Sequence, residues 1–117
     1  MTNRMQAINI HSEGFLESLK QGRQEAFHAL FMAFHKPLCF FAARVVRDGE
    51  EAEDIVQEVF LSFWKMERES FPNLKTIKTF LYNSVQNRCL NYLRDLEIRD
   101  RNYRNLNREE LDEDYFL

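Results

Sequence analysis

The chain has 117 residues, enough for one domain with a modest core, and its 44% hydrophobic and 14% aromatic content excludes a disordered chain. Only 3 glycines and 2 prolines leave little material for the turns of an all-β fold, so an all-α fold is predicted. The formal net charge of −3 conceals two regions of opposite sign.

Those two regions are adjacent in the sequence. Residues 50–69 carry seven acids against two bases, whereas residues 75–104 carry seven bases against three acids. An acidic surface beside a basic one suits two different partners.

The sequence offers no membrane or export signal. No apolar run approaches the length of a membrane-spanning helix, and residues 1–10 are too polar for a signal peptide. Cys39 and Cys89 are isolated within helical patterns, which is typical of reduced core thiols. We therefore expect a cytoplasmic protein with no membrane contact.

The first half of the chain predicts two helices. Residues 1–11 show no period and are expected to be flexible; a short helix capped by Ser12 should then run to Gly22. A second helix is predicted over residues 23–46, with a kink or a break after Lys36 because Pro37 lies inside the pattern. Its apolar positions are Ala26, Phe27, Leu30, Phe31, Phe34, Leu38, Phe41, Ala42 and Val45.

A third helix is predicted from about Glu50 to Met66, and its two faces differ. The apolar face, expected to be buried, consists of Ala52, Ile55, Val56, Val59, Phe60, Phe63 and Met66. The opposite face carries Asp54, Gln57, Glu58 and Leu61. An apolar anchor with a polar rim is typical of a docking surface, although single exposed leucines are also common on solvated faces.

A loop and a last helix complete the predicted bundle of about four helices. Residues 67–75 read as a loop in which Phe71 is the one large apolar side chain. Thr76 should cap a helix that reaches about Asp95 or beyond, before the period fades after Asn102 into an acidic tail. Its expected buried positions are Ile77, Leu81, Val85, Cys89, Tyr92 and Leu96.

No catalytic, cofactor-binding or metal-binding constellation is present in the sequence. The three histidines, His11, His28 and His35, lack the spacing and partners of a zinc site. There is no glycine-rich phosphate loop and no nucleophile elbow. We therefore expect neither an enzyme nor a cofactor.

The last helix carries a second, polar stripe formed by Asn83, Asn87, Asn91 and Arg94, with Phe80 at its start and Lys78 nearby. Amides and arginine can hydrogen-bond base edges, and the basic neighbourhood favours a nucleic acid as the partner. The alternative is that the asparagines face water. For Phe80 alone, packing into a neighbouring helix is the favoured interpretation.

Two blocks of the sequence also resemble a known family. Residues 54–64 read Asp-x-x-Gln-Glu-Val-Phe-Leu-x-x-Trp, which resembles region 2.2 of bacterial RNA polymerase sigma factors of the extracytoplasmic-function (ECF) type. A second block, Phe80-Leu81-Tyr82 followed by Asn87 and by Tyr92-Leu93-Arg94, resembles regions 2.3 and 2.4. The resemblance covers about residues 15–99.

The resemblance implies two binding surfaces. The first block would dock on the clamp helices of the largest subunit of core RNA polymerase, through Asp54, Gln57 and Glu58, with Leu61 as the anchor. The second would bind the non-template strand of the minus-ten promoter element and help to open the duplex. The predicted DNA-binding residues are Phe71, Lys75, Lys78, Asn83, Asn87 and Arg94.

The resemblance also implies a domain organisation: a flexible segment at 1–11, a region 2 domain at 12–99, and the start of an acidic linker at 100–117. The second, helix-turn-helix domain that the family ordinarily carries is absent from this chain. An anti-sigma factor is a further candidate partner. A helical protein–protein adaptor without a nucleic-acid role is the alternative hypothesis.

Overall fold

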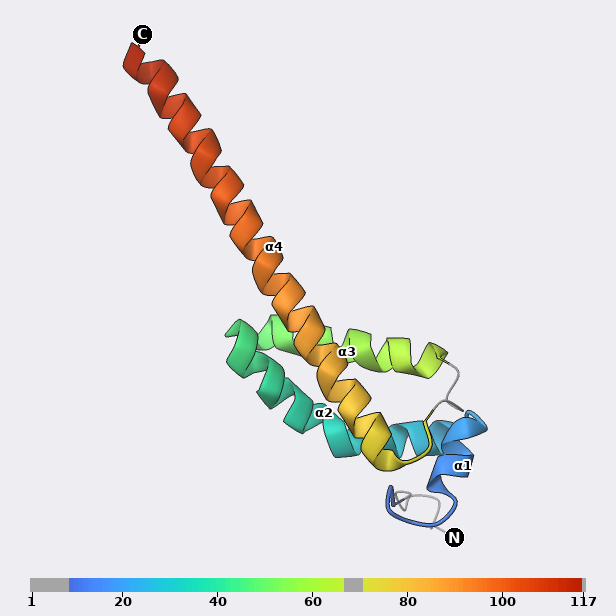
Figure 1. Ribbon diagram of the computed structural model, residues 1–117. Coiled ribbons are helices and arrows are strands. Elements are labelled where there is room, and N and C mark those ends of the chain that lie inside the picture. The colour runs from blue at the N-terminus through green and yellow to red at the C-terminus, as the bar shows by residue number, and fades with distance from the viewer. Residues whose placement is uncertain (1–8, 67–70, 117) are drawn as a thin grey trace.

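The computed structural model describes residues 9–66 and 71–116, with side chains described up to residue 106. It contains four helices, α1 (Phe15–Lys20), α2 (Gln24–Val46), α3 (Gly49–Lys65) and α4 (Leu74–Phe116), and no strand in these residues. The all-α prediction is confirmed. Figure 1 shows α1, α2, α3 and the start of α4 gathered at one end of the molecule.

The short helix α1 is held by two buried side chains, Phe15 and Leu19. Ser12 does not cap it, since its side chain donates to the Asn9 carbonyl at 2.6 Å and the helix begins after Gly14. Gly22 ends the helix as predicted, with a φ of 79° that favours glycine. These turns at both ends set α1 against the first half of α2.

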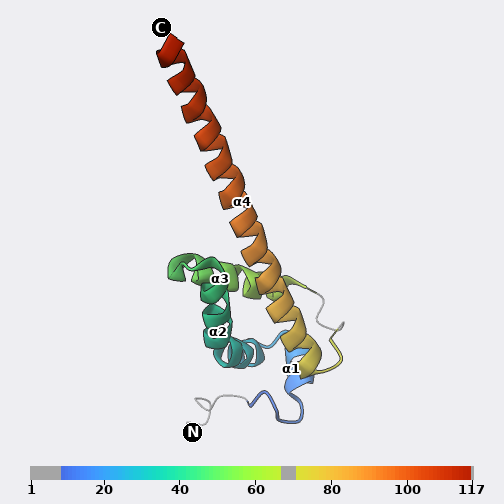
Figure 2. The same ribbon diagram turned by 60° about the vertical axis from the view of Figure 1, so that its left-hand side comes forward.

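Helix α2 runs through Pro37 without a break. Proline cannot donate the backbone hydrogen bond to the residue four positions earlier, so a change of direction at this point costs less than elsewhere. Figures 1 and 2 show α2 bent rather than straight. The kink is therefore what the structure shows, and the alternative of two separate helices is wrong.

Helix α3 begins where the Asp48 side chain accepts the backbone N–H groups of Glu50 and Glu51, both at 3.1 Å. An N-cap of this kind stabilises a helix by about 1 kcal/mol. The apolar face is buried as predicted, at Ala52, Ile55, Val56, Val59, Phe60 and Phe63. Met66 is the exception, because the backbone is already extended there and its side chain is exposed.

Helix α4 starts two residues before the predicted cap and ends far beyond the predicted end. Asn73, not Thr76, is the cap, since its Oδ1 accepts the Thr76 backbone N–H at 2.8 Å. The helix then continues to Phe116 through the segment expected to be linker. The molecule is consequently 78 Å long but only 29 and 20 Å across, with α4 protruding from the bundle (Figure 2).

The core is shared by all four helices but includes only the first part of α4. Ile77, Leu81, Val85 and Cys89 are fully buried, as predicted. Tyr92 is only half-buried and Leu96 is exposed, so the prediction that Leu96 is buried is wrong. The reason is geometric: from Arg94 to Leu106 every side chain is exposed, because α4 has left the bundle.

One helix, α2, is long and apolar enough to cross a membrane by length and composition alone. The sequence analysis did not expect a segment of this kind. Seven α2 residues are buried in the core of the bundle, which accounts for its apolar character: Ala26, Ala29, Leu30, Phe34, Leu38, Ala42 and Val46. A core helix of a soluble domain passes the same test, so this length carries little weight.

Candidate functional site

The outward face of α3 lies opposite the core. Asp54, Gln57, Glu58 and Leu61 are all exposed, and Leu61 keeps 59% of its surface accessible. Residues three and four positions apart lie side by side on a helix, so the four side chains form one patch, which we call the α3 outer face. An exposed leucine among acids and an amide is what the docking prediction requires.

The α3 outer face is joined to α4 by one arginine. Arg88 Nη1 lies 3.0 Å from Glu58 Oε1, and Arg88 Nη2 donates to Ser62 Oγ at 3.2 Å. The sequence analysis assigned no role to Arg88 and missed this contact. Arg88 is 30 positions from Glu58 and 26 from Ser62, so no local spacing signals these contacts.

The polar stripe of α4 faces solvent. Asn83, Asn87, Asn91 and Arg94 are all exposed, and Arg94 Nη2 donates to Asn91 Oδ1 at 3.0 Å. Their positions fall on the side of the helix away from Leu81 and Val85, which are buried. This α4 amide stripe thus presents side-chain amides and a guanidinium to solvent on one helix face.

The two predicted lysines lie elsewhere on α4. Lys75 and Lys78 line a groove near the start of the helix. At 3.6 residues per turn, Lys78 and Asn87 lie about 180° apart around the axis. The other residues that line the groove are Ile10, His11, Ala33, Phe34 and Leu74, none of which the sequence analysis had assigned to it.

Phe71 does not lie on the surface as a DNA-stacking role would require. Only 6% of its surface is exposed, and its ring packs 5.4 Å from that of Phe63 and 5.3 Å from that of Phe80. The sequence analysis expected the ring of Phe71 to be free to contact DNA. Burial of such an apolar ring in the core is energetically favourable, and the structure shows this outcome. We therefore remove Phe71 from the candidate DNA-binding residues. Phe80, as expected, packs against its neighbours.

The two cysteines are free thiols. Burial raises the pKa of Cys89, and burial together with the negative charge of Glu53 raises the pKa of Cys39. Both are therefore protonated at neutral pH and poor nucleophiles. Within residues 9–66 and 71–106, no group of His, Cys, Asp and Glu side chains is placed to hold a metal ion.

Comparison with protein-family models matches residues 30–98 to sigma-70 region 2. The chain belongs to the sigma-70 family. The matched segment contains the α3 outer face, the α4 amide stripe and both groove lysines, whereas α1 and the end of α4 lie outside it. No curated protein and no solved structure matches the chain.

Membership of the sigma-70 family indicates the general role of this domain. Region 2 of these factors binds core RNA polymerase and recognises the minus-ten promoter element, and it is a transcription-factor domain rather than an enzyme domain. The all-helical bundle of α1, α2, α3 and the first part of α4 agrees with that assignment.

Proposed function

We propose that this chain is the promoter-opening domain of a cytoplasmic sigma factor of the ECF type. The observation that carries the proposal is the sigma-70 region 2 match, which includes an exposed acidic-apolar face and an exposed amide stripe. These are the two surfaces that such a factor needs, one for the polymerase and one for DNA.

Core polymerase binding is assigned to the α3 outer face. Leu61 supplies an apolar anchor, and Asp54, Gln57 and Glu58 supply polar groups that fix orientation on the clamp helices. Arg88 holds Glu58 from the side, which restricts the rotamers of that carboxylate before the partner arrives. The interface would therefore lose less side-chain entropy on docking.

Recognition of the minus-ten element is assigned to the α4 amide stripe. Asn83 and Asn87 each offer a side-chain donor and acceptor to a base edge, and Arg94 offers further donors. Inside a duplex the Watson–Crick edges are paired, so the stripe can use them only on an unpaired strand. Preference for the single non-template strand is what would convert binding into opening.

The groove lysines have a different role in the proposal. Lys75 and Lys78 line the groove at the start of α4 and carry positive charge without base-edge geometry, so they would contact phosphates. A strand bound to both surfaces would have to pass around the start of α4. An anti-sigma factor would compete for the same exposed faces.

The proposal is tested by fluorescence anisotropy on short labelled DNAs with the chain bound to core polymerase. We expect tighter binding to the single non-template strand than to the matching duplex. Asn87→Ala should reduce discrimination among base sequences, because an amide that reads base edges is lost. Lys78→Ala should weaken all sequences alike and flatten the salt dependence, because a phosphate contact is lost.

Asn102→Ala is the matched control, since Asn102 is an exposed amide of the same helix that lies eight positions beyond Arg94, the last member of the stripe. It should leave both discrimination and salt dependence unchanged. Equal affinity for single strand and duplex, with neither Asn87→Ala nor Lys78→Ala having an effect, would contradict promoter opening. A chain that still bound core polymerase would then fit the protein–protein adaptor.

A further inference from the structure

The groove near the start of α4 is formed by three segments that lie far apart in the sequence. Lys75 and Lys78 belong to α4, Phe34 belongs to α2, and His11 belongs to the segment before α1. Figure 1 shows that segment just below the start of α4. The volume of the groove is about 400 Å³, so it can admit part of a nucleic-acid backbone.

The groove has only basic groups among its titratable side chains. Lys75 and Lys78 are exposed, and they lie side by side because they are three positions apart on one helix. His11 is exposed as well, and no carboxylate is among the described residues that line the groove. A concave site lined in this way attracts an anion.

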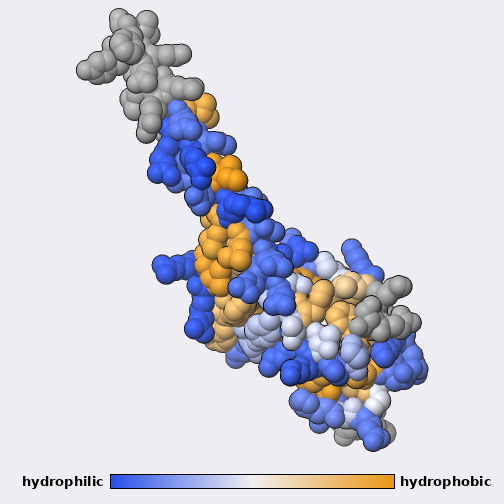
Figure 3. Space-filling view, viewed as in Figure 1, coloured by the Kyte–Doolittle hydropathy of each residue, from blue (hydrophilic) through white to orange (hydrophobic). Residues whose placement is uncertain are grey.

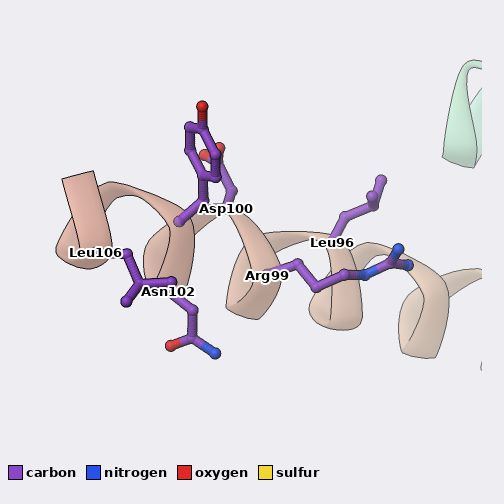
Figure 4. A pocket seen from close by; sticks show the side chains of 6 residues that line it. Leu96, Arg99, Asp100, Asn102 and Leu106 are labelled. Atoms are coloured by element: carbon purple, nitrogen blue, oxygen red, sulfur yellow. The ribbon is translucent and has the colours of Figure 1, made fainter.

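A second hollow, on the protruding part of α4, lacks these features. Figure 3 shows hydrophobic and hydrophilic side chains interleaved along this part of the helix. All the residues that line the hollow come from α4, and Arg99 and Asp100 bring opposite charges into it (Figure 4). Because it has one helix as its wall and no excess of either charge, it does not select an anion.

His11 is held beside the groove by the turn that precedes α1. Its backbone N–H donates to Asn9 Oδ1 at 2.8 Å, and Ser12 Oγ donates to the Asn9 carbonyl at 2.6 Å. The neighbouring Ile10 is half-buried and packs against the core. The backbone at position 11 is thus ordered before a ligand arrives, which lowers the entropy lost on binding.

We propose that His11 is a third phosphate contact in this groove, beside Lys75 and Lys78, for the DNA strand that the domain binds. The inference rests on the proposed function, since it takes that DNA as the ligand. A protonated imidazole carries a positive charge and can donate through both ring nitrogens. The segment before α1 thereby becomes part of the DNA-binding surface, although it lies outside the matched residues 30–98.

A histidine contact differs from a lysine contact in its dependence on pH. Imidazole groups generally change charge between about pH 5 and 8, a range in which lysine stays charged. A nearby phosphate favours the protonated ring, so proton binding and DNA binding should reinforce each other. The other charged groups that line the groove are Lys75 and Lys78, and α2 contributes only uncharged side chains to it. DNA should therefore bind more tightly as the pH falls.

The proposal is tested by fluorescence anisotropy on the labelled single non-template strand, with the chain bound to core polymerase. At about pH 5.5 we expect His11→Gln to bind DNA about fivefold more weakly than the unchanged chain, and at about pH 8 equally well, since only the charged ring makes the contact. At the lower pH this variant should also reduce the salt slope of the affinity by about 0.7, the value for one phosphate contact on a single strand. His11→Lys should bind tightly at both pH values, because its charge does not titrate in this range.

His28→Gln is the matched control, since His28 is an exposed histidine of α2 that does not line the groove. It should leave DNA affinity unchanged at both pH values. Both histidines lie outside the buried core, so thermal melting of each variant should be unchanged as well.

The inference is overturned if His11→Gln matches the unchanged chain at the lower pH while Lys78→Ala still weakens binding, and the proposed function then stands. If Lys78→Ala and Asn87→Ala also have no effect, the proposed function fails together with the inference. A loss of core polymerase affinity in His11→Gln without DNA, at unchanged DNA affinity, would also overturn the inference, because the groove would then contact the polymerase.

Discussion

Arg88 of α4 and Glu58 of α3 form a 3.0 Å ion pair that ties the predicted DNA-binding helix to the predicted polymerase-docking face. The two side chains remain 41% and 62% exposed, so water screens the pair. The pair therefore contributes little to the stability of the fold, and its main effect is to link the two helices.

The first prediction concerns the strength of this pair. A double-mutant cycle with Arg88→Met and Glu58→Gln should give a coupling of about 0.2–1 kcal/mol in the free energy of unfolding, as for other exposed pairs. Urea denaturation of the four proteins measures it. A coupling of several kcal/mol would show that the pair is desolvated in solution.

The second prediction concerns docking. Leu61→Glu should weaken binding to purified core polymerase at least tenfold, because a charge replaces the apolar anchor of the α3 outer face. Its melting temperature should be unchanged, since the side chain is 59% exposed. Titration of labelled chain with core polymerase measures the affinity.

Met32→Glu is the control for this substitution. Met32 is 64% exposed on α2, so the same change is made at a similarly exposed apolar residue outside the α3 outer face. It should leave core binding intact. Equal loss in both variants, or none in Leu61→Glu, would mean that the docking surface lies elsewhere.

The third prediction concerns the core. Phe63 is fully buried and packs against Phe71 and Phe80, so Phe63→Ala should lower the free energy of unfolding by about 3–5 kcal/mol. Phe40→Ala should change it by no more than about 0.5 kcal/mol, because Phe40 is 64% exposed. Similar denaturation curves for the two variants would show that the core is assigned incorrectly.

The fourth prediction separates the two roles considered for Phe71. As a buried core residue, it should cost about 3 kcal/mol of stability when replaced in Phe71→Ala. Single-strand affinity, measured by anisotropy at a temperature where the variant is folded, should be unchanged. The opposite pattern, full stability with weakened DNA binding, would show that the ring leaves the core to stack on a base.

Much of the fold was predictable from local patterns. The apolar spacing of residues 52–63 identified the buried face of α3, and Gly22 marked the end of α1. Pro37 was correctly linked to a kink because its missing N–H is a property of the residue itself. The all-helical class followed from composition, since few glycines and prolines were available for tight turns.

What the sequence by itself determined, then, was where each helix lies, apart from the far end of α4, and which side of each helix is apolar, since both depend on spacing along one chain. Only the tertiary structure decided where that apolar side finds a partner. It brought Arg88 to Glu58, packed Phe71 against Phe63 and Phe80, and placed Lys75 and Lys78 in one groove with residues of other segments. It also left Leu96 exposed although Val85, on the same side of α4, is buried. The physical reason is that burial depends on contacts between distant segments, and α4 extends beyond the last residue with which α2 and α3 can pack.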